Sequence, residues 1–413
     1  MVYTSTVRLY DYISWIARCN KCSACTEYVP DGSYEGLCPM AERNIKESFR
    51  PSGLMELARQ LAIKEHETGE TNIAELAKLV GFNTKSLSER FFSCTECGVC
   101  DISCYTYSGK HPLKIFKAVR RKLVQAGLAP SKFDEVRKNI INYYSPFITD
   151  RSRAVKMGKF FRIPEVAEIP KRGKILYFIG CTTAHSRPQI AQSVIKILNM
   201  ANISFGVMHE EMCCGYPLIH TGQEDAAINL VKSNVQKIKE TEARTVLTSC
   251  AGCFQVLSQD YPELVDNIPF EVAHTTRFFA NLINNKKIRS NPIDTTVTYH
   301  DPCNIGRKAT DPMYEEPRTI LSSIPKLNLV EMSRRKQSSF CCGSGGGVVW
   351  AYPFKMTDWV SKNRVSEAIK VLGQGEEKYL VSACPACELS LGSVGKLNVK
   401  DISEILASSI NVK

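Results

Sequence analysis

The 413-residue sequence lacks several features that would place it in a common class of protein. It has no apolar run of about 18 residues, the length that a membrane-spanning helix requires. Its first residues do not combine a basic stretch with an apolar core, so we expect no secretory signal peptide. No Lys-Ser or Lys-Thr pair follows the glycines at 345–347, which argues against a phosphate-binding loop. These absences predict a cytoplasmic protein without a membrane span of its own.

Charge is abundant but unevenly distributed. The net charge is +11, and residues 105–172 alone contain 16 Lys or Arg against 5 Asp or Glu. Such a segment can face an acidic partner, an anionic membrane surface or nucleic acid. No nucleic-acid-binding motif accompanies it, so we expect no nucleic acid. A docking face for a partner protein and an ordinary solvated helix surface are the two remaining interpretations.

Cysteine is the residue that stands out, with 18 copies in two blocks at 19–104 and 181–387. A cytoplasmic chain of this length keeps its thiols reduced and builds its own core, so the cysteines indicate metal binding rather than disulfides. Pro164 and Pro170 interrupt the pattern between the blocks and predict a domain boundary near 165–172. The predicted domains are residues 1–168, 172–290 and 291–413.

The first block has the spacing of two cubane 4Fe–4S motifs. Three cysteines at C-x2-C-x2-C spacing occur twice, and in two-cluster ferredoxins the fourth ligand comes from the other motif. Helical periodicity at 54–63 and 112–127 predicts a mainly helical domain. Two zinc sites are the alternative, because C-x2-C pairs also bind zinc. We assign one cubane to Cys19, Cys22, Cys25 and Cys104, and the other to Cys94, Cys97, Cys100 and Cys38.

The second block is an internal repeat. In each copy, apolar β-rich runs that end at a cysteine alternate with helical stretches, which predicts an open, mostly parallel α/β sheet. The cysteines then follow the carboxyl ends of strands, where ligands bind in such sheets. The matching segments are KILYFIGC (174–181) with TVTYHDPC (296–303), EMCCGYP (211–217) with FCCGSGG (340–346), and TVLTSCAGC (245–253) with KYLVSACPAC (378–387).

Each copy of the repeat contains five cysteines, one more than a tetrahedral zinc or a simple cubane needs. An odd number argues against disulfides, and thiolates that converge on one point need a metal to offset their charge. The glycines that follow each Cys-Cys pair are expected to let the backbone approach that metal. The first set is Cys181, Cys213, Cys214, Cys250 and Cys253, and the second is Cys303, Cys341, Cys342, Cys384 and Cys387.

These motifs resemble the CCG domains of the heterodisulfide reductase family. The segments VTYHDPCNIGR, FCCGSGGG, TSCAGCF and SACPAC are similar to its D subunit, and the resemblance extends over most of the chain. It implies an α+α/β fold, in which a helical ferredoxin-like domain with two cubane clusters precedes two α/β CCG domains. It also implies that each five-cysteine set holds a non-cubane 4Fe–4S cluster.

The resemblance implies a catalytic iron–sulfur subunit of a hetero-oligomeric oxidoreductase. Electrons would come from a flavoprotein or a membrane cytochrome b, which would also hold the chain at the cytoplasmic face of the membrane. They would pass through the cubanes to the non-cubane clusters, which would reduce or form a thiol–disulfide couple such as CoM-S-S-CoB. The alternative is an electron relay between a dehydrogenase or flavoprotein and the quinone pool. The complete set of ten CCG cysteines favours the disulfide reductase.

His300 lies three residues before Cys303 and is a candidate catalytic residue. Reduction of a disulfide consumes two protons, and histidine is the side chain that titrates near neutral pH. An equally consistent interpretation is that His300 only stabilises the turn at the end of its strand.

Metal analysis of the purified protein separates the iron–sulfur and zinc interpretations. Four 4Fe–4S clusters require about 16 iron atoms per chain. Zinc at several equivalents with little iron would contradict the cluster prediction.

Overall fold

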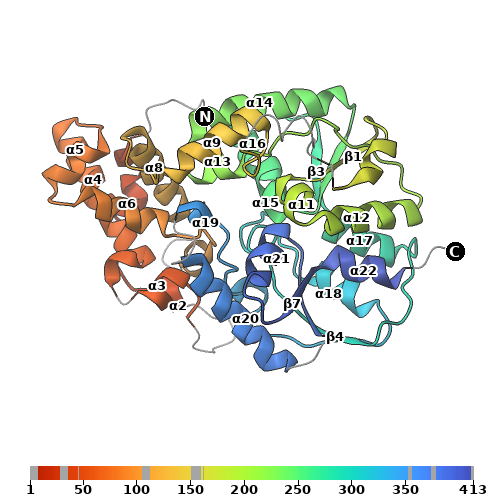
Figure 1. Ribbon diagram of the computed structural model, residues 1–413. Helices are drawn as coiled ribbons and strands as arrows, with labels where there is room; N and C mark the ends of the chain where they lie inside the picture. Colours follow the sequence, from red (N-terminus) through yellow and green to blue (C-terminus); the bar gives the residue numbers. More distant parts are fainter. Residues whose placement is uncertain are drawn as a thin grey trace. The chain divides into compact units, whose positions relative to one another are not determined.

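The structure is a computed structural model that describes residues 8–27, 36–44, 46–104, 112–149, 160, 162–351, 356–373 and 378–410 (Figure 1). The chain forms two compact units, each built from separate stretches of sequence. Unit 1 comprises Met1–Glu135, Pro217–Ala227 and Gln337–Val360. Unit 2 comprises Val136–Tyr216, Ile228–Lys336 and Ser361–Lys413.

The described part of unit 1 is helical, as its periodicity predicts. Its longest helix, α4 (Pro51–Thr68), starts with a proline and ends at Gly69, which has a left-handed φ of 71°. It packs against α8 (Pro112–Gln125) around a core that includes Leu61, Phe91 and Phe116. The other helices mainly in unit 1 are η1 (Leu9–Tyr12), α1 (Ile13–Ile16), α2 (Ala24–Glu27), α3 (Pro39–Arg43), η2 (Glu47–Phe49), α5 (Ile73–Leu79), α6 (Thr84–Phe92), α7 (Val99–Ser103), α13 (Tyr216–His220), η6 (Lys336–Ser338) and α19 (Val348–Ala351).

Unit 2 contains two parallel sheets, one from each copy of the repeat. The first has the order β1-β2-β3, with a parallel bridge from Leu176 to Gly206 on the free side of β1. The second has the order β5-β4-β6-β7. Their bounds are β1 (Ile175–Phe178), β2 (Thr245–Thr248) and β3 (Glu271–His274), then β4 (Thr295–Tyr299), β5 (Leu327–Leu329), β6 (Lys378–Ser382) and β7 (Asn398–Asp401).

The two sheets share one topology, since the segment at Gly206 takes the place that β5 has in the second sheet. In both sheets, the strand that comes first in the chain lies between the second and the third, where the segment at Gly206 counts as the second strand of the first copy. The strand order therefore reverses between β1 and β2, and again between β4 and β6. Open α/β sheets bind their ligands outside the carboxyl ends of the strands at such a reversal. The predicted α+α/β fold is confirmed.

Helices join the two copies within unit 2. The first long helix of each copy packs against the last helix of the other copy (Figure 1). The two pairs are α12 (Pro188–Met200) with α22 (Ile402–Ser409), and α18 (Glu315–Ser322) with α17 (Thr275–Asn284). This reciprocal packing fixes the two sheets relative to each other. The remaining helices mainly in unit 2 are α9 (Lys132–Tyr143), η4 (Pro164–Glu168), α11 (Cys181–Ser186), α14 (Glu224–Glu240), α15 (Ala251–Gln255), η5 (Val256–Asp260), α16 (Tyr261–Leu264), α20 (Asp358–Leu372) and α21 (Pro385–Gly392).

Part of the basic segment 105–172 lies inside unit 1. Consecutive residues of α8 form buried or largely buried ion pairs, in which Arg120 contacts Glu96, Arg121 contacts Glu224 and Lys122 contacts Glu65, each at 2.7 Å. These three basic side chains balance internal carboxylates. They therefore add little to any docking face that this segment offers.

The glycines after Cys341 and Cys342 allow a close approach between parts of unit 1. A Cβ on Gly346, whose φ is +61°, would lie 2.5 Å from the carbonyl oxygen of Cys94. A Cβ on Gly347, at φ +72°, would lie 2.4 Å from Cγ2 of Thr221. In the structure these two glycines thus make room for neighbouring protein atoms. The sequence alone had predicted only that they let the backbone approach a metal.

Gly346→Ala is expected to destabilise the protein more than Gly69→Ala, which is a matched control. Both positions have left-handed φ, which costs an L residue about 1–2 kcal/mol. Only at Gly346 does the new methyl group meet backbone, which adds about 1–3 kcal/mol of overpacking. Thermal unfolding followed by circular dichroism tests this, and equal losses for the two variants would contradict it.

Candidate iron–sulfur sites

The eight cysteines of the first block lie in unit 1, six of them in two similar loops and the helix starts that follow, whereas Cys38 precedes α3 and Cys104 follows α7. The loops start at Cys19 and Cys94, and each has left-handed residues two and four positions later: Lys21 and Ser23 in the first, Glu96 and Gly98 in the second. The first loop leads into α2 and the second into α7. Two left-handed residues curl the backbone, so that cysteines spaced three apart can turn inward around one object.

One cavity of unit 1 brings together four predicted ligands. Its lining includes Cys38, Cys94, Cys97 and Cys100, together with the apolar side chains of Met40 and Phe116. Cys38 comes from the first cysteine loop region and caps the start of α3, whereas the other three belong to the second loop. This grouping supports the exchange of fourth ligands between the two motifs.

The other predicted cubane set is found around α2 and α7, which pack against each other. Burial, together with the charges of Cys38, Cys19 and Cys104, raises the pKa of Cys25 to about 12. Cys25 therefore lies within electrostatic range of Cys38, which is assigned to the other set, as well as of Cys19 and Cys104. Ionised thiols at this spacing repel each other, so they require a bound cation to coexist.

The five cysteines of the first repeat converge in unit 2. The Sγ of Cys253 lies 3.4 Å from the Sγ of Cys214 and donates a hydrogen bond to it. Cys213 is hydrogen-bonded to both Cys181 and Cys214. The amide of Cys253 donates to the Sγ of Cys250 at 3.5 Å. A continuous chain of contacts thus links all five predicted ligands.

This thiol cluster is pre-arranged for metal binding. Hydrogen bonds from Cys213 and then Cys253 lower the pKa of Cys214 to about 5, so one thiolate exists at neutral pH. The remaining thiols must lose protons when they bind a metal. Thiolate sulfurs are the donors that iron–sulfur clusters and zinc prefer, and five of them in contact fit an extended cluster better than one tetrahedral ion.

The C-x2-C motifs of the two copies meet within unit 2. Cys250 follows β2 and Cys384 follows β6, and both residues cap the start of a helix. Hydrogen bonds from Cys250 and then Cys387 lower the pKa of Cys384 well below its usual range. A direct thiol–thiol contact therefore connects the two halves of the repeat at their strand-order reversals.

The second cysteine set is divided between the units. Cys303, Cys384 and Cys387 lie in unit 2, whereas Cys341 and Cys342 lie in unit 1. In unit 1, Cys341 belongs to one apolar cluster with Cys38 and Cys97, two ligands predicted for a cubane. The amide of Gly343 donates to the Sγ of Cys341 at 3.2 Å.

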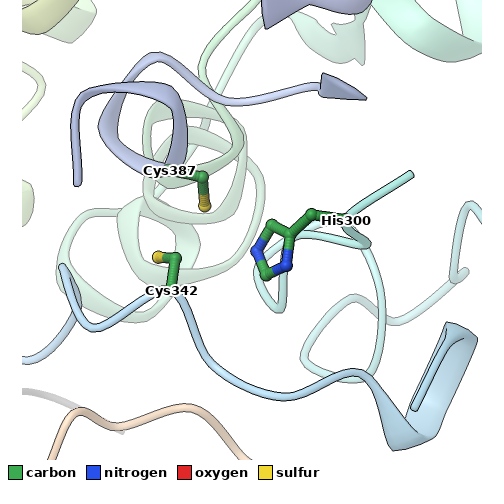
Figure 2. A group of neighbouring side chains, drawn as sticks. All are labelled: His300, Cys342 and Cys387. Carbon is green, nitrogen blue, oxygen red and sulfur yellow. The ribbon is translucent and has the colours of Figure 1, made fainter. Parts of the chain in front are cut away.

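His300 is buried at the end of β4, and its ring is turned toward Cys387 (Figure 2). A ring nitrogen and the Sγ of Cys387 lie within 4.8 Å of each other. Arg364 Nε donates to His300 Nδ1 at 3.1 Å, and because arginine cannot accept a hydrogen bond, the ring carries its proton on Nε2. Burial and the charge of Arg364 lower the pKa of His300 to about 3, so the ring is neutral near pH 7. The expectation that His300 titrates near neutral pH is therefore wrong, because burial penalises the charged ring.

Three buried polar residues near the cysteines escaped the sequence analysis. Glu211 accepts hydrogen bonds from the amides of Ile179 and Gly180 at 2.7 and 2.9 Å, directly before Cys181. His274 and Asp401 occupy matching positions at the ends of β3 and β7, where both cap the following helix. A comparison of the two repeats would not have found them, because the matching residues are of different types.

The comparisons with known proteins agree with this geometry. A family model described as "Cysteine-rich domain" (CCG) matches residues 175–258 and 297–392. The D subunit of the dihydromethanophenazine:CoB–CoM heterodisulfide reductase of Methanosarcina barkeri is 32% identical over 408 residues, which cover 96% of this chain and 93% of that protein. The chain belongs to the family of heterodisulfide reductase D subunits. It is therefore an iron–sulfur oxidoreductase subunit that transfers electrons.

More distant relatives of the chain carry other names. The B subunit of the fumarate reductase (CoM/CoB) of Methanothermobacter marburgensis is 31% identical over 78% of this chain and 62% of that protein. The EtfAB:quinone oxidoreductase of Syntrophomonas wolfei is 27% identical over 73% of this chain and 43% of that protein. Among the described residues, no helix combines the length and apolar character needed to cross a membrane.

Serine substitutions test which cysteines share a cubane. Cys38→Ser and Cys94→Ser are expected to alter the same EPR signal of the reduced protein, because both residues line one cavity. Cys104→Ser and Cys19→Ser are expected to alter the other cubane signal. If Cys38→Ser instead changed the signal that Cys19→Ser changes, each motif would bind its cluster without exchanging ligands.

Proposed function

We propose that this chain is the catalytic iron–sulfur subunit of a heterodisulfide-reductase-like complex. It would accept electrons from a partner and reduce, or in reverse form, a small thiol–disulfide couple. The observation that carries this proposal is the contact between Cys250 and Cys384, which joins the C-x2-C motifs of the two copies at equivalent strand ends. A chain that only relays electrons would not need the two motifs joined in this way.

The proposed cofactors are two cubane and two non-cubane 4Fe–4S clusters, which supply one-electron transfer when bound. The cavity of unit 1 supports a cubane on Cys38, Cys94, Cys97 and Cys100. The second cubane is proposed on Cys19, Cys22, Cys25 and Cys104, of which Cys19 and Cys104 lie within electrostatic range of Cys25. The non-cubane ligands are proposed to be Cys181, Cys213, Cys214, Cys250 and Cys253 in the first copy, and Cys303, Cys341, Cys342, Cys384 and Cys387 in the second.

The residues of the chain have three tasks in this proposal. The cysteine thiolates bind the clusters, and amides such as those of Glu96 and Gly343 donate hydrogen bonds to their sulfurs. The helix start at Cys384 stabilises negative charge on its thiolate. His300, the proposed catalytic histidine, holds a proton on Nε2 on the side of Cys387.

The reaction balances with two electrons and two protons for each disulfide. The sulfur–sulfur bond breaks, two S–H bonds form, and a reduced partner is oxidised. We propose a flavoprotein or a membrane cytochrome b as this partner in a hetero-oligomer, which would also hold the chain at the cytoplasmic face of the membrane. The name of the Methanosarcina relative suggests the CoB–CoM heterodisulfide as the substrate to test first.

A relay function is the second candidate, and a specific likeness favours it. The similarity to an EtfAB:quinone oxidoreductase extends over 73% of this chain. In that case the chain would pass electrons between a flavoprotein and a quinone and would bind no disulfide.

A viologen assay separates these two functions. Purified protein with its full iron content is expected to oxidise two reduced viologens for each molecule of CoM-S-S-CoB consumed. Cys384→Ser, which removes the thiol at the contact between the copies, should abolish turnover yet keep both cubane EPR signals.

The matching control is Lys85→Ala, a change in the exposed first turn of α6 that should leave turnover unaltered. If the wild-type protein consumes no low-molecular-weight disulfide while its clusters are reduced normally and a quinone analogue is reduced, the relay function is correct.

A further inference from the structure

A single arginine connects three stretches of chain inside unit 1. The guanidinium of Arg120, in α8, is fully buried and lies beside the loop that starts at Cys94. It donates to the carbonyl oxygens of Phe91 at 2.8 and 3.1 Å and of Cys94 at 2.6 Å. It also donates to the carbonyls of His220 and Gly346, both at 2.8 Å. Arg120 thereby joins the cysteine loop to the glycine-rich loop that follows Cys342.

The counter-ion of Arg120 comes from within the cysteine motif itself. Glu96 lies between Cys94 and Cys97 and is buried with 1% of its surface exposed. Its carboxylate accepts from Arg120 Nη1 at 2.7 Å and lies 2.5 Å from Nδ1 of His220. Its φ of +50° is a left-handed conformation that costs a non-glycine residue of order 1–3 kcal/mol, so the surrounding contacts must maintain it.

The left-handed conformation of Glu96 also serves the adjacent sulfur. The amide of Glu96 donates to the Sγ of Cys94 at 3.4 Å. Glu96 therefore directs its backbone N–H at the predicted ligand Cys94 and places its carboxylate charge beside the same loop. Hydrogen bonds to the sulfurs, net charge and solvent exposure are the quantities by which a protein tunes the reduction potential of a cluster.

The other cubane loop has less buried charges around it. There Lys21 has a similar left-handed φ of 58° and half of its side chain is exposed, and its partner Glu56, 3.3 Å away, is 24% exposed. Arg59, also 24% exposed, pairs with Glu56 at 3.0 Å and donates to the carbonyl oxygen of Cys19 at 2.7 Å. Exposed charges are screened by water and salt, whereas buried ones act over several ångströms with little screening. The charges around the two loops should therefore affect the two clusters very differently.

We propose that Arg120 and Glu96 set the reduction potential of the cubane on Cys38, Cys94, Cys97 and Cys100, and that Arg120 is its positioning residue. The inference rests on the proposed cluster assignment. Reduction adds negative charge to a cluster, so the cation of Arg120 raises the potential and the anion of Glu96 lowers it. The two effects oppose each other, so the loss of either charge alone is expected to shift the potential.

The test is a redox titration of the full-length, cluster-loaded protein, followed by EPR and without any disulfide substrate. Arg120→Met removes the cation and should lower the midpoint potential of one cubane, whereas Glu96→Gln should raise the potential of the same cubane. Each shift is expected to change the ratio of reduced to oxidised cluster at least tenfold, which is 59 mV for a one-electron couple.

Two further variants separate charge from mere structural damage. Arg120→Lys keeps the charge but loses most of the carbonyl contacts, so its potential should stay near that of the wild type. The double variant Arg120→Met/Glu96→Gln removes both charges and should also stay close. Arg121→Met is the matched control, because this neighbour on α8 pairs with Glu224 instead of the cysteine loop.

The outcomes distinguish this inference from the proposed function. Opposite shifts for Arg120→Met and Glu96→Gln, confined to one cubane, support it. Shifts in the same direction, unchanged potentials, or an equal shift for Arg121→Met would overturn it while the cluster assignment stands. If Arg120→Met does not fold, a raised potential in Glu96→Gln together with an unchanged potential in Arg120→Lys still supports the inference, and a lowered potential in Glu96→Gln overturns it. A wild-type protein without cubane signals would overturn both proposals.

Discussion

Close contact between buried thiols is the constraint on which the rest of this structure depends. Cys214 contacts both Cys213 and Cys253, and Cys250 contacts Cys384 across the two copies of the repeat. Few of these groups can ionise together unless a metal offsets their charge, because like charges in a buried site repel strongly. The helix start at Cys384 stabilises negative charge on that sulfur, and the amide of Cys253 donates to the Sγ of Cys250 at 3.5 Å.

The contact between Cys250 and Cys384 results from the two-copy architecture of unit 2. In both sheets the cysteines follow strands on either side of the reversal in strand order, where a crevice forms in open parallel sheets. The reciprocal packing of α12 with α22 and of α17 with α18 holds the two sheets together. One C-x2-C motif alone would be an ordinary metal-binding loop, whereas the two motifs in contact form one group of thiols that both copies share.

Unit 1 differs from unit 2 because it holds two similar cysteine loops in different environments. The loop at Cys94 is stabilised by the buried pair of Arg120 and Glu96, while the loop at Cys19 has a partly exposed pair of Lys21 and Glu56. Gly346 approaches the carbonyl of Cys94, so the segment after Cys342 is packed against the cysteine loop within the same unit. This arrangement links the predicted ligands of two clusters through backbone contacts.

The sequence by itself determined the ligand types, the repeat and the parallel sheets. These depend on local spacing: cysteines three residues apart fall in one loop, and apolar runs that end at cysteines form strands with thiols at their ends. Tertiary structure alone decided that Cys250 meets Cys384, that Arg364 directs the proton of His300 to Nε2, and that Arg120 is internal. Arg120 lies within a basic segment that resembles a solvated surface in the sequence. Its burial follows from contacts with Glu96 and Gly346, 24 and 226 residues away, which no local pattern encodes.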